Sequence, residues 1–63
     1  MQPHQERVLA EKADLDDKAA KLLKFIDGDV YDTLPETDRE LLEQQYLIMA
    51  SYSAILGKRI ARF

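Results

Sequence analysis

The chain has no cysteine and no tryptophan, and only two glycines, two prolines and one histidine among its 63 residues. Without cysteine no disulfide can form, and a single histidine leaves too few nitrogen and sulfur ligands for a structural zinc site. Two glycines that stand far apart cannot make a glycine-rich phosphate loop. A domain this small usually needs disulfides, a bound metal or oligomerisation to be stable. With the first two excluded, self-association is the means of stabilisation that is left.

Long hydrophobic runs are also missing. The longest stretch without charge, residues 44–57, contains two glutamines and two serines. It is shorter than the roughly 20 apolar residues that span a membrane, and no signal-peptide pattern follows Met1. We therefore expect a soluble, cytosolic protein without a membrane partner.

Groups for catalysis are sparse. His4 is the single histidine, and no acid-and-serine arrangement stands near it. Asp27, Asp29 and Asp32 alternate like calcium ligands, but the bidentate acid and the spacing of an EF-hand loop are absent. We predict that the chain is not an enzyme, with no catalytic residues, no metal ligands and no cofactor.

Charge is unevenly distributed around a net value of −3. Residues 1–26 carry five acids and five bases, residues 27–43 carry seven acids and Arg39, and residues 44–63 carry three bases and no acid. The acidic total argues against general DNA or RNA binding. The chain is nevertheless electrically polar, with an acidic middle and a basic end.

Apolar residues in the first half recur at spacings typical of a helix. Pro3 suits a first helical turn, and the pairs Asp14–Lys18 and Asp17–Lys21 suit the exposed surface. The stripe consists of Val8, Leu15, Ala19, Leu22 and Ile26. A helix over residues 3–27 follows, and Gly28 is expected to end it in a left-handed conformation.

A second helix is predicted over residues 34–62, after a loop at 28–33. Thr33 and Glu36 fit a capping box around Pro35. The helix carries two apolar stripes about 100° apart. The first contains Leu42, Tyr46, Met49, Leu56, Ile60 and Phe63, and the second contains Leu41, Ile48, Tyr52 and Ile55. Gly57 lies inside the helix, where we expect a bend or the close approach of another backbone or a ligand.

Two helices with a short connection should lie antiparallel, so residues 1–63 are predicted to form a single all-α hairpin. Both helices carry more apolar surface than one neighbour can cover. We therefore predict a two-helix hairpin that oligomerises into a helical bundle. The residues expected at the oligomer interface are Leu9, Leu23, Leu41, Ile48, Tyr52 and Ile55.

An antiparallel hairpin brings basic residues from both helices to its open end. Arginine forks and the free amides of a helix N-terminus bind phosphate well. The candidate ligand-binding residues are His4, Arg7, Lys58, Arg59 and Arg62, with Tyr52 as a stacking surface. The same bases also fit a structural role, because cations at a helix C-terminus complement its dipole and aid solubility. Both interpretations stay open.

The segments PHQERVLAEKADLDDKAAKLLKFI and LLEQQYLIMASYSAILGKRIARF resemble the crAss-like-phage-related small proteins, a family of short tailed-phage proteins that open with P-H-Q-x-R-V-x-x-E-K-x-x-L. In size and hairpin shape the chain is more distantly similar to phage sponge proteins, which oligomerise and sequester the cyclic-nucleotide signals of CBASS and Thoeris immunity. The resemblance implies an immune-evasion protein of the host cytoplasm that holds a cyclic di- or trinucleotide, or a cyclic ADP-ribose-type signal, without cleaving it.

An alternative prediction belongs to another class of protein. The surplus apolar stripe would suit a small inhibitor or adaptor that docks a helix face on a host defence protein. The nucleotide, the oligomer number and the host system stay open.

Overall fold

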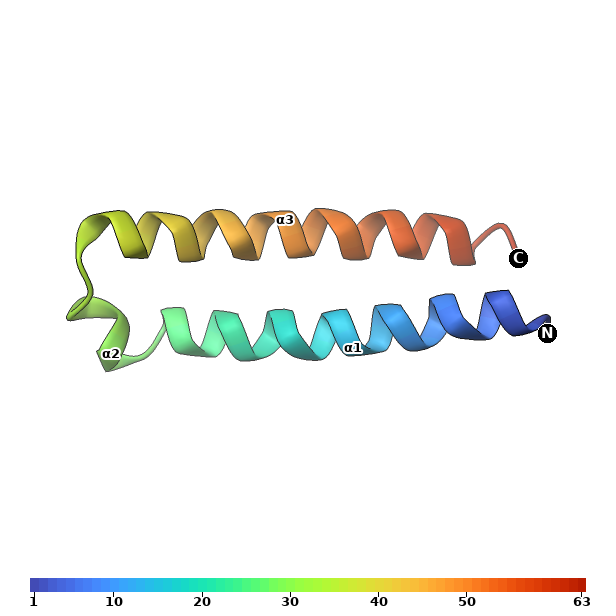
Figure 1. Cartoon of the computed structure of the whole chain (residues 1–63), viewed down its shortest axis with the longest axis horizontal. Coiled ribbons are helices and arrows are strands. Elements are labelled where there is room, and N and C mark those ends of the chain that lie inside the picture. The colour runs from blue at the N-terminus through green and yellow to red at the C-terminus, as the bar shows by residue number, and fades with distance from the viewer.

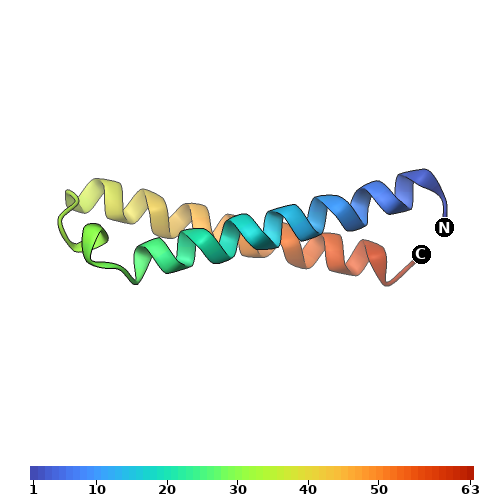
Figure 2. The same cartoon turned by 90° about the horizontal axis from the view of Figure 1, so that it is seen from below.

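The computed structural model describes all 63 residues, of which 84% are helical, and contains no strand. Helix α1 spans Pro3–Ile26, the single turn α2 spans Asp29–Asp32, and α3 spans Glu36–Ile60. In Figures 1 and 2, α1 and α3 run antiparallel side by side, with both termini at one end and α2 at the other. The molecule measures 46 × 14 × 13 Å. The predicted all-α helical hairpin is confirmed.

Helix α1 begins where its sequence predicts. Pro3 occupies the first helical position, and the backbone N–H of Gln2 donates a 3.0 Å hydrogen bond to Oε1 of Gln5. The pairs Asp14–Lys18 and Asp17–Lys21 both form on the exposed surface, with nitrogen–oxygen distances of 3.0 Å.

The connection between the long helices differs from the prediction. Gly28 has φ −92°, so the left-handed helix end expected there is wrong. The capping box is wrong too, because Pro35, with φ −57° and ψ 150°, is the residue from which α3 starts. Thr33 instead ends the turn α2, where its hydroxyl donates a 2.6 Å hydrogen bond to the carbonyl of Val30. Helix α3 thus begins at Glu36, two residues after the expected start.

The hydrophobic core is one narrow seam between α1 and α3. Only two side chains are buried, Val8 at 6% exposure and Leu56 at 0%. The other seam residues are half-buried: Leu15, Ala19, Leu22, Ile26, Leu42, Tyr46, Met49 and Ile60. Phe63 was expected in this stripe, but α3 ends at Ile60 and the phenyl ring is 44% exposed. The expected interface residues Leu9, Leu23, Leu41, Ile48, Tyr52 and Ile55 are all exposed in the single chain.

Candidate functional site at the open end of the hairpin

A polar cluster interrupts the apolar seam between the centre of the hairpin and its open end. The Lys12 ammonium is 2.7 Å from Oδ2 of Asp16 and donates a 3.1 Å hydrogen bond to Oγ of Ser53 on α3. The Ser53 hydroxyl in turn donates to Oδ1 of Asp16. The hydrogen bond from Lys12, and to a lesser extent the one from Ser53, holds the pKa of the Asp16 carboxyl below its usual 3.8. This cluster links the two helices and fixes their register.

The sequence prediction missed this cluster, although the apolar spacing holds a signal for it. The stripe of α1 jumps seven residues from Val8 to Leu15, and that of α3 jumps seven from Met49 to Leu56. Lys12 and Ser53 fill these two gaps on the inward faces, where both are half-buried. Two gaps of the same size, facing each other in an antiparallel pair, indicate a matched polar contact.

The Lys12–Ser53 contact shows which residues lie at the same height near the open end. Counting five residues back along α1 and five forward along α3 places Arg7 level with Lys58. Three further steps place His4 level with Ala61, next to Arg62. The hairpin therefore brings His4 and Arg7 to the height of the basic C-terminal segment, as the sequence predicts for antiparallel helices.

Three of the predicted ligand residues, Arg7, Tyr52 and Arg59, share one side of the hairpin. Leu23 of α1 and Leu47 of α3 line a common hollow and so mark one side of the seam. Helix geometry puts Arg7 on the opposite side, because at about 100° per residue Arg7 and Leu23 fall on either side of Val8. On α3, Tyr52 and Arg59 are seven residues apart and project away from the Leu47 side. Lys58, eleven residues after Leu47, lies instead on the Leu47 side. Tyr52 lies two turns inward of Arg59, about 10 Å along the axis.

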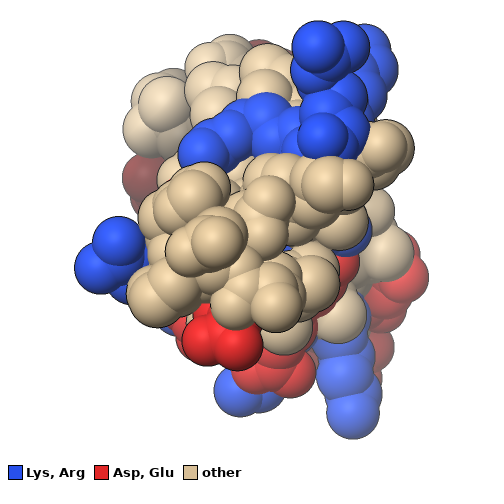
Figure 3. Space-filling view, turned by 90° about the vertical axis from the view of Figure 1, so that its right-hand side faces the viewer, with Lys and Arg blue, Asp and Glu red and all other residues tan.

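The basic side chains at this end have no acidic partners. The three ion pairs of the molecule are Lys12–Asp16, Lys18–Asp14 and Lys21–Asp17. Figure 3 looks onto the open end and shows Lys and Arg atoms over its upper, α3 half beside a broad uncharged area. The exposed residues expected to bind a ligand are His4, Arg7, Tyr52, Lys58, Arg59 and Arg62. The lysine and arginine side chains among them are therefore available to an anion in the isolated chain.

The amides of the α1 N-terminus contribute less than expected. The N–H groups of Gln5 and Glu6 both donate to the carbonyl of Gln2, at 3.0 and 3.1 Å, and Pro3 has no N–H. Only the His4 amide remains free in this turn, because Gln2 closes the helix end itself. An anion here would be held mainly by side chains rather than by several free backbone N–H groups of the first helical turn.

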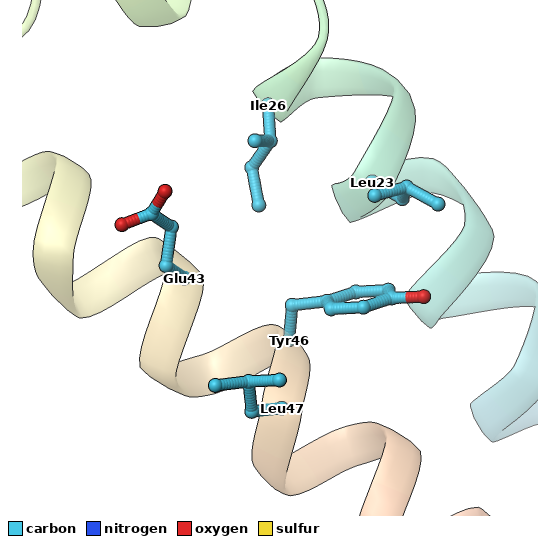
Figure 4. A pocket seen from close by; sticks show the side chains of 5 residues that line it. All are labelled: Leu23, Ile26, Glu43, Tyr46 and Leu47. Carbon is cyan, nitrogen blue, oxygen red and sulfur yellow. The ribbon is translucent and has the colours of Figure 1, made fainter.

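The one hollow in the surface lies away from the basic end, nearer the connection. It has a volume of about 280 Å³ and is lined by Leu23, Ile26, Glu43, Tyr46 and Leu47. Figure 4 shows the Tyr46 ring lying across the gap between the helices, with Leu47 beside it and the Glu43 carboxylate pointing away from the ring. Four of the five lining residues are apolar, so the hollow does not resemble a phosphate site.

A second polar contact ties α2 to α3. The Tyr31 hydroxyl donates a 3.4 Å hydrogen bond to the carbonyl of Arg39. Burial raises the pKa of this phenol above its ordinary 10.0, and the neighbouring Glu43 carboxylate adds to the effect. The contact anchors the acidic connection at the end of the molecule far from the candidate site.

The fold and its open end define a small all-α protein of two antiparallel helices with a basic, exposed tip. The chain belongs to the Sequestin family, whose model matches residues 2–62. It is 38% identical over 63 residues to the 7.5 kDa protein in the denB–rIIB intergenic region of Enterobacteria phage T4, covering 100% of this chain and 98% of that protein. No solved structure matches. These matches confirm the predicted likeness to small phage proteins, whereas the narrower crAss-like assignment stays a prediction.

No helix has the combination of length and apolar character needed to cross a membrane.

Proposed function

We propose that this chain is a phage sequestering protein that binds a cyclic-nucleotide immune signal at its open end and holds it without cleaving it. The observation that carries the proposal is the set of bases at that end, which form no ion pair and have no acid among residues 44–63. The name of the family, Sequestin, fits a protein that binds rather than converts its target. The signal would be met in the host cytoplasm.

The chemistry assigns a role to each candidate residue. Arg7 and Arg59 donate paired N–H groups to phosphate oxygens, a geometry that lysine cannot reproduce. Lys58 and Arg62 add charge around them, His4 offers a ring N–H as a hydrogen-bond donor, and Tyr52 offers a ring on which a base can stack. Since His4 is the single histidine and the chain has no cysteine, no residue at this end is set up to attack a phosphodiester.

Calorimetric titration with a panel of cyclic dinucleotides, cyclic trinucleotides and cyclic ADP-ribose-type molecules tests the proposal. We expect one class to bind the natural chain and to lose at least tenfold in affinity with Arg59→Gln and Arg62→Gln together. A matched control replaces Lys18 and Lys21, which already pair with Asp14 and Asp17, and should bind normally. Heat denaturation of the complex should return intact nucleotide. Failure of every member of the panel to bind would refute the proposal.

Self-association is part of the same proposal. Ile48 is 69% exposed and lies on the side of α3 that projects away from the hollow. We expect Ile48→Glu to dissociate the assembly and reduce its helix content, because an unpaired charge in an interface costs several kcal/mol. Ala50→Glu, at an exposed position about 200° round α3 from Ile48, should leave the assembly intact. Sedimentation equilibrium at micromolar concentration distinguishes the two, and a well-folded natural monomer would contradict self-association.

The exposed apolar residues of α3 also favour a second candidate function. An inhibitor or adaptor would dock this face on a host defence protein instead of on another copy. Capture of one stoichiometric host protein by both the natural chain and the Arg59→Gln, Arg62→Gln variant would favour this candidate. Loss of capture in that variant would make the basic end, rather than the apolar face, the binding surface.

A further inference from the structure

An apolar surface without a partner runs along α3. We call it the α3 face, and it consists of Leu41, Ile48, Tyr52 and Ile55, which are 57%, 69%, 44% and 56% exposed. Their separations of seven, four and three residues keep them on one side of the helix. This side projects away from Leu47 and from the hollow. A continuous apolar stripe about 20 Å long is therefore open to solvent in the single chain.

The surface area of the chain indicates how large a partner contact it needs. A compact protein of 7.3 kDa exposes about 4,200 Å². This chain exposes 4875 Å². The excess of roughly 700 Å² is close to the area of about 800 Å² that each partner buries in a standard protein interface. A second copy packed on the α3 face would bring the exposed area into the usual range.

The charges along α3 determine how that second copy is oriented. The first turns of the helix carry Glu36, Asp38 and Glu40, and the last turn carries Lys58 and Arg59. Two parallel α3 helices would bring like charges together at both ends. Two antiparallel helices would place the basic turn of each beside the acidic turn of the other, and their helix dipoles would also be opposed.

We propose that two copies pair through the α3 face in antiparallel orientation, with a two-fold axis passing close to Ile48. The proposal rests on the self-association proposed above and specifies its geometry. Leu41 and Ile55 are each seven residues from Ile48, so Leu41 of one copy packs against Ile55 of the partner subunit. The chain thus supplies a self-complementary surface from a single helix.

The same axis matches charged residues at the edge of the α3 face. Glu40 and Lys58 are 18 residues apart, which is five helical turns, so they lie on the same side of α3. Their midpoint falls within one residue of Ile48. Glu40 of one copy therefore lies beside Lys58 of the partner subunit, and the two-fold axis produces this contact twice.

Cysteine crosslinking tests the orientation, and the natural chain has no cysteine to interfere. Leu41→Cys and Ile55→Cys are prepared separately, mixed under reducing conditions and then oxidised. In the antiparallel dimer, two copies of position 41 lie about 21 Å apart, well beyond the 7 Å limit between Cα atoms in a disulfide. We expect neither variant to crosslink alone and the mixture to give the mixed disulfide as its main product.

Each other outcome overturns the proposal. Efficient crosslinking of each variant with itself would mean a parallel pair, and no crosslinking in the mixture would mean that the α3 face is not the contact. Both substitutions are at exposed positions, and circular dichroism of the reduced proteins verifies that the helices remain. No nucleotide is present, so the result is independent of whether the chain binds one.

Charge exchange provides a second test that needs no crosslink. Glu40→Lys alone and Lys58→Glu alone should each weaken the dimer roughly tenfold, because each places like charges together twice. The two changes in one chain should restore the natural dissociation constant. Lys24→Glu is the matched control, since Lys24 is likewise in the last turn of its helix but lies on α1, and it should leave dimerisation unchanged. Equal dissociation constants for the single variants and the natural chain, or no restoration by the double change, would overturn the Glu40–Lys58 contact.

Discussion

The side chain of Lys12 passes over Gly57 on the facing helix, so that a Cβ atom at Gly57 would lie 3.5 Å from Cε of Lys12. The glycine was expected to mark a bend or the close approach of another backbone or a ligand, but the group that approaches it is this lysine side chain. A distance of 3.5 Å is an ordinary van der Waals contact, so one methyl group fits without displacing the ammonium from Ser53.

Gly57→Ala should therefore stabilise the hairpin. Alanine favours the helix interior by about 1 kcal/mol over glycine, and the new methyl group adds a contact instead of a clash. Urea unfolding followed by circular dichroism should show a rise of about 0.5–1 kcal/mol. Gly28→Ala is the comparison, because its Cβ would meet the Phe25 carbonyl at 3.3 Å and should give a smaller gain. A loss of stability in Gly57→Ala would mean that the added methyl group displaces the Lys12 side chain from its position over residue 57.

Acid should weaken the contact between the helices through Asp16. Its carboxyl has a lowered pKa in the folded chain, so the stability it contributes is present above the unfolded value of 3.8 and is lost as the pH falls through the folded value. Asp16→Asn should remove this part of the pH dependence, measured as urea midpoints between about pH 2 and 6. Asp17→Asn, which disturbs only the surface pair with Lys21, should keep it. An unchanged acid profile in Asp16→Asn would contradict the assignment.

Tyr31 should lose its phenolic proton at a higher pH than a free phenol does. Burial against α3 and the nearby Glu43 carboxylate both disfavour the phenolate, so its pKa lies above 10.0. The chain has three tyrosines, and the difference in phenolate absorbance between the natural chain and Tyr31→Phe isolates the one of interest. A midpoint at or below 10.0 in that difference spectrum would show that α2 does not hold the ring against α3.

A bound nucleotide should raise the melting temperature of the natural chain. At a hundredfold excess over the dissociation constant, binding adds about 2.7 kcal/mol, which is roughly 10–20 °C for a domain of this size. Sulfate at the same micromolar concentration is the control, because excluded salts act only at much higher concentrations. The double variant Arg59→Gln, Arg62→Gln should lose the response. Identical melting curves with and without nucleotide would reduce these arginines to helix-dipole and solubility residues.

Much of the fold could be predicted because it depends on local regularities. The spacing of Val8 and Leu15 predicts α1, Pro3 marks its start, and a short connection makes the pair antiparallel. The connection was harder to predict, since both Thr33 and Pro35 are good residues for a helix start. The competition is decided by α2, which uses the Thr33 hydroxyl to end its own turn and leaves the start of α3 to Pro35.

The candidate site could be predicted only in part for a different reason. The grouping of Arg7 with Lys58 at one height follows from antiparallel packing, and the register given by Lys12 and Ser53 supports it. Lys12 and Ser53 were missed because a search for apolar periodicity passes over polar residues at inward positions. The closure of the α1 N-terminus by Gln2 and Gln5 was missed because glutamine is an uncommon capping residue.

The Lys12–Ser53 contact also determines which alignments of the hairpin are tolerated. Two helices with apolar residues at heptad-like spacing could slide by seven residues and still match one apolar side chain with another. In such a slipped hairpin, Lys12 would face Tyr46 or Ile60 and lose the Ser53 acceptor. A half-buried ammonium without that acceptor destabilises the folded chain, and the apolar contacts of the slipped alignment do not compensate for it. The chain therefore has one preferred alignment, and the relative height of its two ends, with the charges they carry, is set by a hydrogen bond several turns away.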